Sequence, residues 1–250
     1  MPNARDSDYT SGPRPLIPGG TQLVSKRPEM YLPGLWPAYY SKAEGCRIWD
    51  LDGRELINMS INGVGTCPLG YADPDVNAAV KNAVDRGSMT TLNCPEEVEL
   101  AELLCELHPW AGMVRYARSG GEAMAMAIRI ARAKTGKSKV AFCGYHGWSD
   151  WYLAANLTEN DVLGQKNFLL PGLSPAGVPV GLKGTAHSFR HNRIEELHEI
   201  VRDHGGELAV IVVEPQRYER PTPEFLAGVR AAANETGAPF GFSIPVFALL

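Results

Sequence analysis

Three short segments hold the residues of this chain that are best suited to bind a ligand. Ser119–Gly121 stands where a predicted strand meets a predicted helix, and backbone N–H groups at a helix start favour an anion such as phosphate. Tyr145 and His146 follow the next predicted strand, and Glu214 closes a third. Carboxyl ends of parallel strands meet at one edge of a sheet, so together these residues suit a phosphorylated aromatic cofactor.

Each segment also has a simpler interpretation. Ser119 can be an ordinary helix cap on a tight turn, and an aromatic loop such as Gly144–Trp148 can serve packing alone. These alternatives stay open for each segment taken singly.

Common catalytic and nucleotide motifs fail on specific residues. No glycine pattern completes a dinucleotide fingerprint or a P-loop. His187 and His191 have zincin spacing, but Ser188 stands where the glutamate is needed, so a solvated face is expected for both histidines. Ala117 replaces the glycine of a nucleophile elbow before Ser119. The five cysteines form no CxxC pair, so no metal site is expected.

The composition is typical of a globular chain and does not indicate a nucleic-acid or membrane partner. With 250 residues, 44% of them apolar, the chain can bury a sizeable core. A net charge of −4 without a basic run argues against a nucleic-acid partner. The apolar stretches are too short for a membrane span and no signal peptide is visible, so a cytoplasmic location is expected.

Periodicity predicts the elements that position the three segments. A hairpin is expected around Asp52-Gly53, and helices are expected after the Asp73 cap, over 95–107 with well-covered leucines, over 122–134 and over 223–235. Strands are expected over 113–117, 140–143 and 208–213. This alternation predicts an α/β protein with a largely parallel sheet.

Five motifs in order carry a family resemblance. They are Leu69–Pro74, Glu99–Leu104, Arg118–Ala123, Tyr145–Gly147 and Val213–Pro215. Together they resemble the class III (ω-type) pyridoxal-phosphate (PLP) aminotransferases, particularly the glutamate-1-semialdehyde aminomutase-like branch. The resemblance runs from about Pro18 to Ala233 and covers most of the chain.

The resemblance implies a fold-type I PLP-dependent transferase with helices on both faces of the sheet. Residues 1–70 would form an arm and part of the small domain, and residues 71–250 an incomplete PLP-binding large domain. Ser119, Gly120 and Gly121 would hold the cofactor phosphate, Tyr145 would stack on the pyridine ring, His146 would lie beside it, and Glu214 would lie near the ring hydroxyl. A small-molecule amino donor, an oxo acceptor and a homodimer are also implied.

Two departures from the family pattern affect the expected function. Residues 239–245 stand where the family's aspartate strand should be, and the Schiff-base lysine would lie beyond Leu250, as in a chain truncated within the large domain. Val64 stands where the mutases often have an aromatic residue, which leaves the substrate open. Residues 240–250 are expected to be exposed, without a partner strand.

The leading hypothesis is therefore an aminotransferase or aminomutase whose chain as given lacks its lysine and has no turnover alone. A non-catalytic remnant that folds or dimerises is the alternative, and an unrelated α/β nucleotide-binding module is a third hypothesis.

Overall fold

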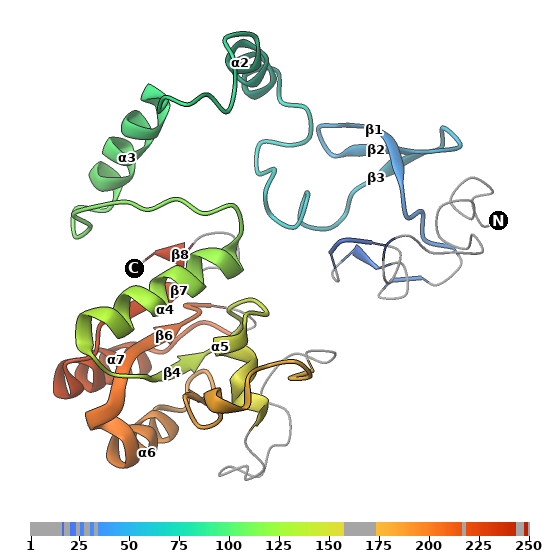
Figure 1. Cartoon of the computed structure of the whole chain (residues 1–250). Helices are drawn as coiled ribbons and strands as arrows, with labels where there is room; N and C mark the ends of the chain where they lie inside the picture. Colours follow the sequence, from blue (N-terminus) through green and yellow to red (C-terminus); the bar gives the residue numbers. More distant parts are fainter. Residues whose placement is uncertain are drawn as a thin grey trace. The chain divides into compact units, whose positions relative to one another are not determined.

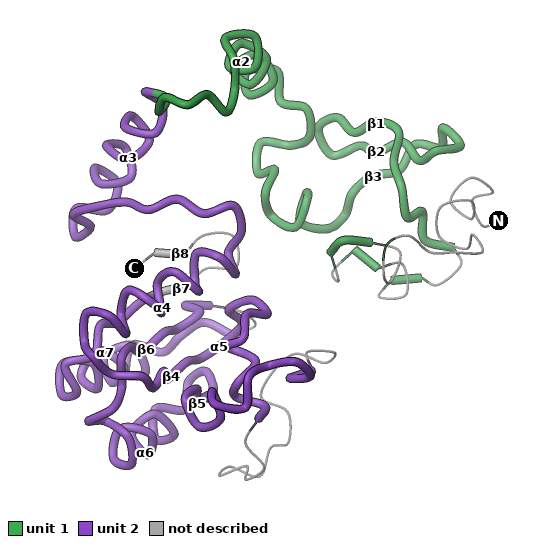
Figure 2. The backbone as a smooth tube through the Cα atoms, viewed as in Figure 1, with its two compact units in different colours: residues 1–94 green, residues 95–250 purple. Residues whose placement is uncertain are grey.

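Two compact units make up the chain in the computed structural model, residues 1–94 and residues 95–250 (Figure 2). The structure describes residue 17 and residues 21–23, 26–27, 31–32, 35–157, 174–216, 219–243 and 248–249. Most of the expected N-terminal arm, the start of the family resemblance at Pro18, and Leu250 thus lie outside the described residues. The unit boundary follows Cys94. The assignment of residues 1–70 and 71–250 to functional domains stays a prediction.

The first unit contains a small antiparallel sheet. Its strands are β1 (Tyr40–Glu44), β2 (Arg47–Asp50) and β3 (Glu55–Ile57), in the order β1-β2-β3. Arg47 is paired with Ile57 and Trp49 with Glu55, which confirms the hairpin expected around Asp52-Gly53.

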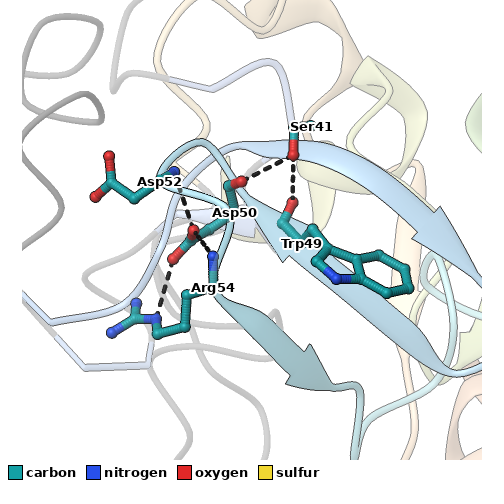
Figure 3. Close-up of polar contacts among 5 residues, drawn as sticks. All are labelled: Ser41, Trp49, Asp50, Asp52 and Arg54. Carbon is teal, nitrogen blue, oxygen red and sulfur yellow. Dashed lines mark hydrogen bonds and ion pairs between the residues drawn. The ribbon is translucent and has the colours of Figure 1, made fainter.

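A buried carboxylate organises the turn of this hairpin (Figure 3). Asp50 is 1% exposed, and its Oδ1 accepts hydrogen bonds from the backbone N–H groups of Asp52 at 3.0 Å and Arg54 at 2.9 Å. Its Oδ2 pairs with Arg54 Nε at 3.0 Å. The Ser41 hydroxyl donates to the carbonyls of Asp50 and Trp49, so β1 is fixed to the same turn.

Two amphipathic helices follow, one in each unit, and neither buries a residue. Helix α2 (Pro74–Asp85) begins at the predicted cap, where Asp73 Oδ1 accepts from the N–H of Val76 at 3.0 Å. Helix α3 (Pro95–Leu107) has the predicted bounds. Its leucines are not well covered, because no side chain of α3 is buried and Leu103 is 50% exposed. That part of the prediction is wrong, since leucine content does not say whether a neighbour packs on the helix.

The second unit holds a five-stranded sheet in the order β5-β4-β6-β7-β8; β4, β6, β7 and β8 are labelled in Figure 1 and β5 in Figure 2. The strands are β4 (Lys139–Cys143), β5 (Ala186–Ser188), β6 (Leu208–Val213), β7 (Phe240–Ser243) and β8 (Ala248–Leu249). All neighbouring pairs are parallel except β7 with β8. This confirms the α/β prediction with a mostly parallel sheet.

Two sequence expectations about strands are wrong. Residues 113–117 form no strand, and Met113 is 92% exposed, because no described strand pairs with this segment. Residues 240–243 do have a partner, since Ile211 of β6 pairs with Phe240 of β7, and β8 pairs on the far side.

Helices cover both faces of the sheet, as expected. Met124 and Ile128 of α4 (Gly120–Thr135) pack on Val140 and Phe142, together with side chains of α5 (Asp150–Leu153) and the 3-10 helix η4 (Ala154–Leu157). The opposite face meets α6 (Ile194–His204) and α7 (Pro223–Thr236). The short helices η5 (Val180–Leu182) and η6 (Gly205–Glu207) precede β5 and β6.

Over residues 140–143 of β4 and 210–213 of β6, the side chains alternate between these two layers. Cys143 and Val213 belong to the layer of α6 and α7, whereas Phe142 and Val212 belong to that of α4. In the described part of the chain, no helix has the length and apolar character of a membrane span.

Candidate functional site

The N-terminus of α4 and the loop after β4 meet at the carboxyl edge of the sheet. Ser119 is the helix cap, and its Oγ accepts the N–H of Glu122 at 3.3 Å. A Cβ built on Gly147 would lie 2.9 Å from the Cα of Gly121, so the two backbones are in contact. Gly147 has φ +96°, a conformation that glycine adopts without strain. The predicted anion turn and aromatic loop are thus adjacent.

Ser149 adds a hydrogen bond to this contact that the sequence did not indicate. Its hydroxyl donates to the Gly121 carbonyl at 3.3 Å. A serine directly before Asp150 suggests only a helix cap, and Ser149 is indeed the N-cap residue of α5, but its side chain makes no capping bond there. The Ser149 side chain therefore fixes the first turn of α4 to the loop after β4.

Glu214 lies beneath the aromatic loop. It follows β6, is 1% exposed, and its Oε2 accepts the backbone N–H of Tyr145 at 2.8 Å. Its own N–H donates to the Cys143 carbonyl at 2.8 Å, which continues the β4–β6 ladder by one bond. Gly144 permits this approach, because a Cβ there would lie 2.4 Å from Glu214 Cβ and 2.6 Å from Oε2. Gly144 is thus a site residue of the predicted loop, and only the structure shows that it must lack a side chain.

The Tyr145 ring is half-buried and meets Tyr152 edge-on, with centroids 6.0 Å apart. The Tyr152 hydroxyl donates to the Gly144 carbonyl at 3.0 Å. Tyr152, like Ser149, is therefore a residue that the sequence analysis missed. Its helix α5 has only four residues, so no periodic pattern could have indicated it.

His146 points into the core. Only 2% of its surface is exposed, its ring stands edge-on to Phe142 and Tyr152, and its Nε2 lies 2.9 Å from the Cys143 carbonyl. The structure thus brings the residues at 119–121, Tyr145 and Glu214 together at one edge. His146 lies on the inner side of the same loop.

The thiol of Cys143, at the end of β4, is a poor nucleophile because it stays protonated. Burial raises the pKa of Cys143 to about 12, and the charges of Glu214 and Glu196 add to this effect. A thiol stays protonated near neutral pH under these conditions. Among the described residues, no group of three or more histidine, cysteine or acidic side chains could hold a metal ion.

The zincin-spaced histidines lie on different segments. His187 is in β5, half-buried, with its ring tilted by 32° against that of His204 at 4.3 Å between centroids. Burial, and then the charge of His204, lower the pKa of His187 to about 4. His191 lies in the loop after β5, with Nε2 3.2 Å from the Pro215 carbonyl. The expectation of a solvated helix or loop face is wrong for His187, because it lies half-buried in the edge strand β5 beside His204.

Comparisons with known proteins agree with this architecture. A solved transaminase with PLP bound is similar to this chain with a TM-score of 0.81 and 28% identity, over 96% of this chain and 55% of that one. The fold is therefore that of the fold-type I PLP-dependent transferases. A family model described as aminotransferase class-III matches residues 33–240, and the chain belongs to that family. The resemblance predicted from the five motifs is confirmed.

Two curated relatives indicate the range within the family. A 3-aminobutyryl-CoA aminotransferase of Cloacimonas acidaminovorans is 29% identical over 239 residues, covering 93% of this chain and 53% of the relative. A glutamate-1-semialdehyde 2,1-aminomutase of Desulfovibrio desulfuricans is 37% identical over 205 residues, covering 80% and 47%. The chain thus spans about half the length of the curated relatives it matches.

Proposed function

We propose that this chain binds PLP at the carboxyl edge of its sheet, as the cofactor-binding part of an aminotransferase or aminomutase. The reaction would move an amino group from a small-molecule donor to an oxo acceptor, or within one molecule as in glutamate-1-semialdehyde 2,1-aminomutase. Membership of the class-III family supports this proposal. The observation that carries it is the Gly121–Gly147 contact, which joins the helix end proposed to bind an anion to the aromatic loop.

The first turn of α4 fits a phosphate group. Amides in the first turn of a helix have no acceptor within it, and the positive helix end attracts an anion. A Cβ built on Gly121 would meet nothing closer than Ser149 Oγ at 3.8 Å. Packing within the described chain therefore leaves room at Gly121. Ser119, Gly120 and Gly121 would hold the phosphate.

The aromatic loop fits the pyridine ring. Tyr145 would offer its ring for stacking, and Glu214 would hold the Tyr145 backbone through the bond from its N–H. His146 would act from beneath, since its buried ring braces the loop against Phe142 and Tyr152.

When bound, the PLP ring serves as an electron sink that withdraws electrons from the carbon that carries the amino group. The chain's own residues would bind its phosphate, orient its ring and keep water from the inner face of the loop. A bound ring held in one orientation is the precondition for stereospecific proton movement on the substrate.

The alternative, a chain without turnover of its own, is favoured by the places of its described lysines. In the second unit, the four described lysines all precede or begin a strand: Lys134 lies near the end of α4, Lys183 lies before β5, Lys137 Nζ donates to the Thr236 carbonyl, and Lys139 Nζ donates to Glu207. The candidate site lies at the carboxyl end. We therefore expect PLP binding without amino transfer by this chain alone. Homodimer formation and a cytoplasmic location belong to the same proposal.

Calorimetric titration tests the phosphate assignment. Gly120→Val should weaken PLP binding, because a β-branched side chain obstructs the backbone approach to phosphate. Gly206→Val is the matched control. Gly206 lies on η6 at the amino end of β6, away from the candidate site, and a Cβ built on it meets no atom within 4 Å. Pyridoxal without the phosphate should bind more weakly than PLP. Equal binding of the two ligands, or a folded chain without PLP binding, would contradict the proposal.

A further inference from the structure

Loop 190–193, which follows β5, is bound to the segment that directly follows Glu214. His191 Nε2 lies 3.2 Å from the Pro215 carbonyl. Asn192 makes three further contacts: its Nδ2 donates to the Arg220 carbonyl at 3.0 Å and to Glu219 at 3.4 Å, and its Oδ1 accepts the N–H of Thr222 at 2.9 Å. We call these four contacts the Asn192 clasp.

The clasp has a rigid base on α6. Glu196 is 3% exposed, and its carboxylate accepts the backbone N–H of Arg190 at 2.7 Å and pairs with the Arg190 guanidinium. A buried carboxylate with both oxygens engaged has a well-defined position. The loop that carries His191 and Asn192 is therefore anchored before it reaches the other segment.

Asn192 also adopts a conformation that costs energy for most residues. Its φ is +58°, in the left-handed region, where asparagine is tolerated better than most non-glycine residues. This backbone conformation accompanies a side chain that reaches three partners in residues 219–222.

The clasp holds both ends of the segment after Glu214. At one end it contacts Pro215, the next residue, and at the other it contacts Thr222, whose Oγ1 caps α7 through the N–H of Phe225 at 3.1 Å. Glu214 thus lies between β6 and Pro215, which His191 contacts, while the bonds of Asn192 itself are to residues 219–222. The direction of its carboxylate sets the position of Tyr145 through the 2.8 Å bond.

We propose that Asn192 is a positioning residue for the candidate site, which it controls through Glu214 and the Tyr145 backbone. The consequence for PLP rests on the proposed function, whereas the consequence for the Tyr145 amide does not. Asn192 itself would touch neither cofactor nor substrate.

Amide hydrogen exchange measured by NMR on the whole chain tests this proposal. Asn192→Gly keeps the left-handed backbone without strain and removes all three side-chain bonds. If the stabilisation lost at Tyr145 equals the net contribution of one hydrogen bond, its amide should exchange about 5-fold faster. The Thr222 amide should also exchange faster. Asn192→Asp keeps the acceptor for Thr222 and should show a smaller increase, and it serves alone if the glycine variant does not fold.

Ala72→Gly is the control, because it makes a similar backbone change at φ +53° where no side-chain hydrogen bond is lost. It should leave both amides unchanged. Faster exchange at Thr222 with unchanged exchange at Tyr145 in Asn192→Gly would overturn the proposal. PLP affinity, measured in parallel, should fall in the order parent, Asn192→Asp, Asn192→Gly. A parent that binds no PLP would refute the proposed function but leave the exchange result decisive for Asn192.

Discussion

Replacing Gly144 with alanine should destabilise the second unit more than replacing a glycine that has the same left-handed backbone but open space around it. The new Cβ would stand 2.4 Å from Glu214 Cβ and 2.6 Å from its Oε2. The first contact is the more costly, because Cβ is fixed to the backbone of a buried residue and cannot rotate away. Alanine must also adopt φ +96°.

Two effects add in this variant. The left-handed backbone costs roughly 1–2 kcal/mol for an alanine. Overpacking a closed site costs about 1–3 kcal/mol more. We therefore expect the free energy of unfolding to fall by about 2–5 kcal/mol, a large part of the stability of a domain.

Urea unfolding followed by circular dichroism measures this change, and two further variants separate its causes. Gly136→Ala carries the backbone cost alone, since Gly136 has φ +68° and no atom within 4 Å of its built Cβ. Glu214→Gly removes the clashing atoms, so in that background Gly144→Ala should cost about as much as Gly136→Ala. The difference between backgrounds, a coupling of about 1–3 kcal/mol, is the contact itself. A Gly144→Ala cost no larger than that of Gly136→Ala would refute the reasoning.

Three further predictions concern other residues. Asp50→Ala should lower the unfolding free energy of the first unit by about 1–3 kcal/mol in denaturant titrations, because two backbone N–H groups lose a buried acceptor; a change below about 0.5 kcal/mol would contradict this role. The depressed pKa of His187, about 4 in the folded chain, means that the unfolded chain binds more protons between that value and 6.5. The contribution of His187 to the free energy of unfolding should thus be fully present above pH 6.5 and be lost as the pH falls toward 4. In thermal melts, His187→Gln should make the loss of stability over this pH range smaller. Tyr145→Phe should keep most PLP affinity in calorimetry, while Tyr145→Ala loses about 0.5–1.5 kcal/mol of binding free energy; equal binding by both would make the ring a packing residue.

Local signals predicted several elements of the second unit closely, although α6 and β5 were not predicted. Strand β6 has the expected bounds at Leu208 and Val213, and α7 begins at the expected Pro223. An apolar run between turn residues and a proline after a capping threonine are set by nearby residues, so they can be interpreted without the rest of the fold.

The pairing of strands and the burial of helix faces could not be predicted from the local sequence pattern. Residues 113–117 have strand composition but pair with no described strand, and the leucines of α3 are unburied. The pairing of a strand and the burial of a helix face depend on a neighbour that the local sequence does not specify.

The sequence by itself determined which residues of the candidate site stand at the ends of strands and at the start of α4. It also determined the family, because five ordered motifs are more specific than any one of them. Only the tertiary structure decided that His146 turns inward while Tyr145 stays half-buried, and that Gly144 must lack a side chain. The reason is physical: Gly144 and Glu214 become neighbours only when β4 and β6 pair, and steric exclusion between them acts over ångströms in space.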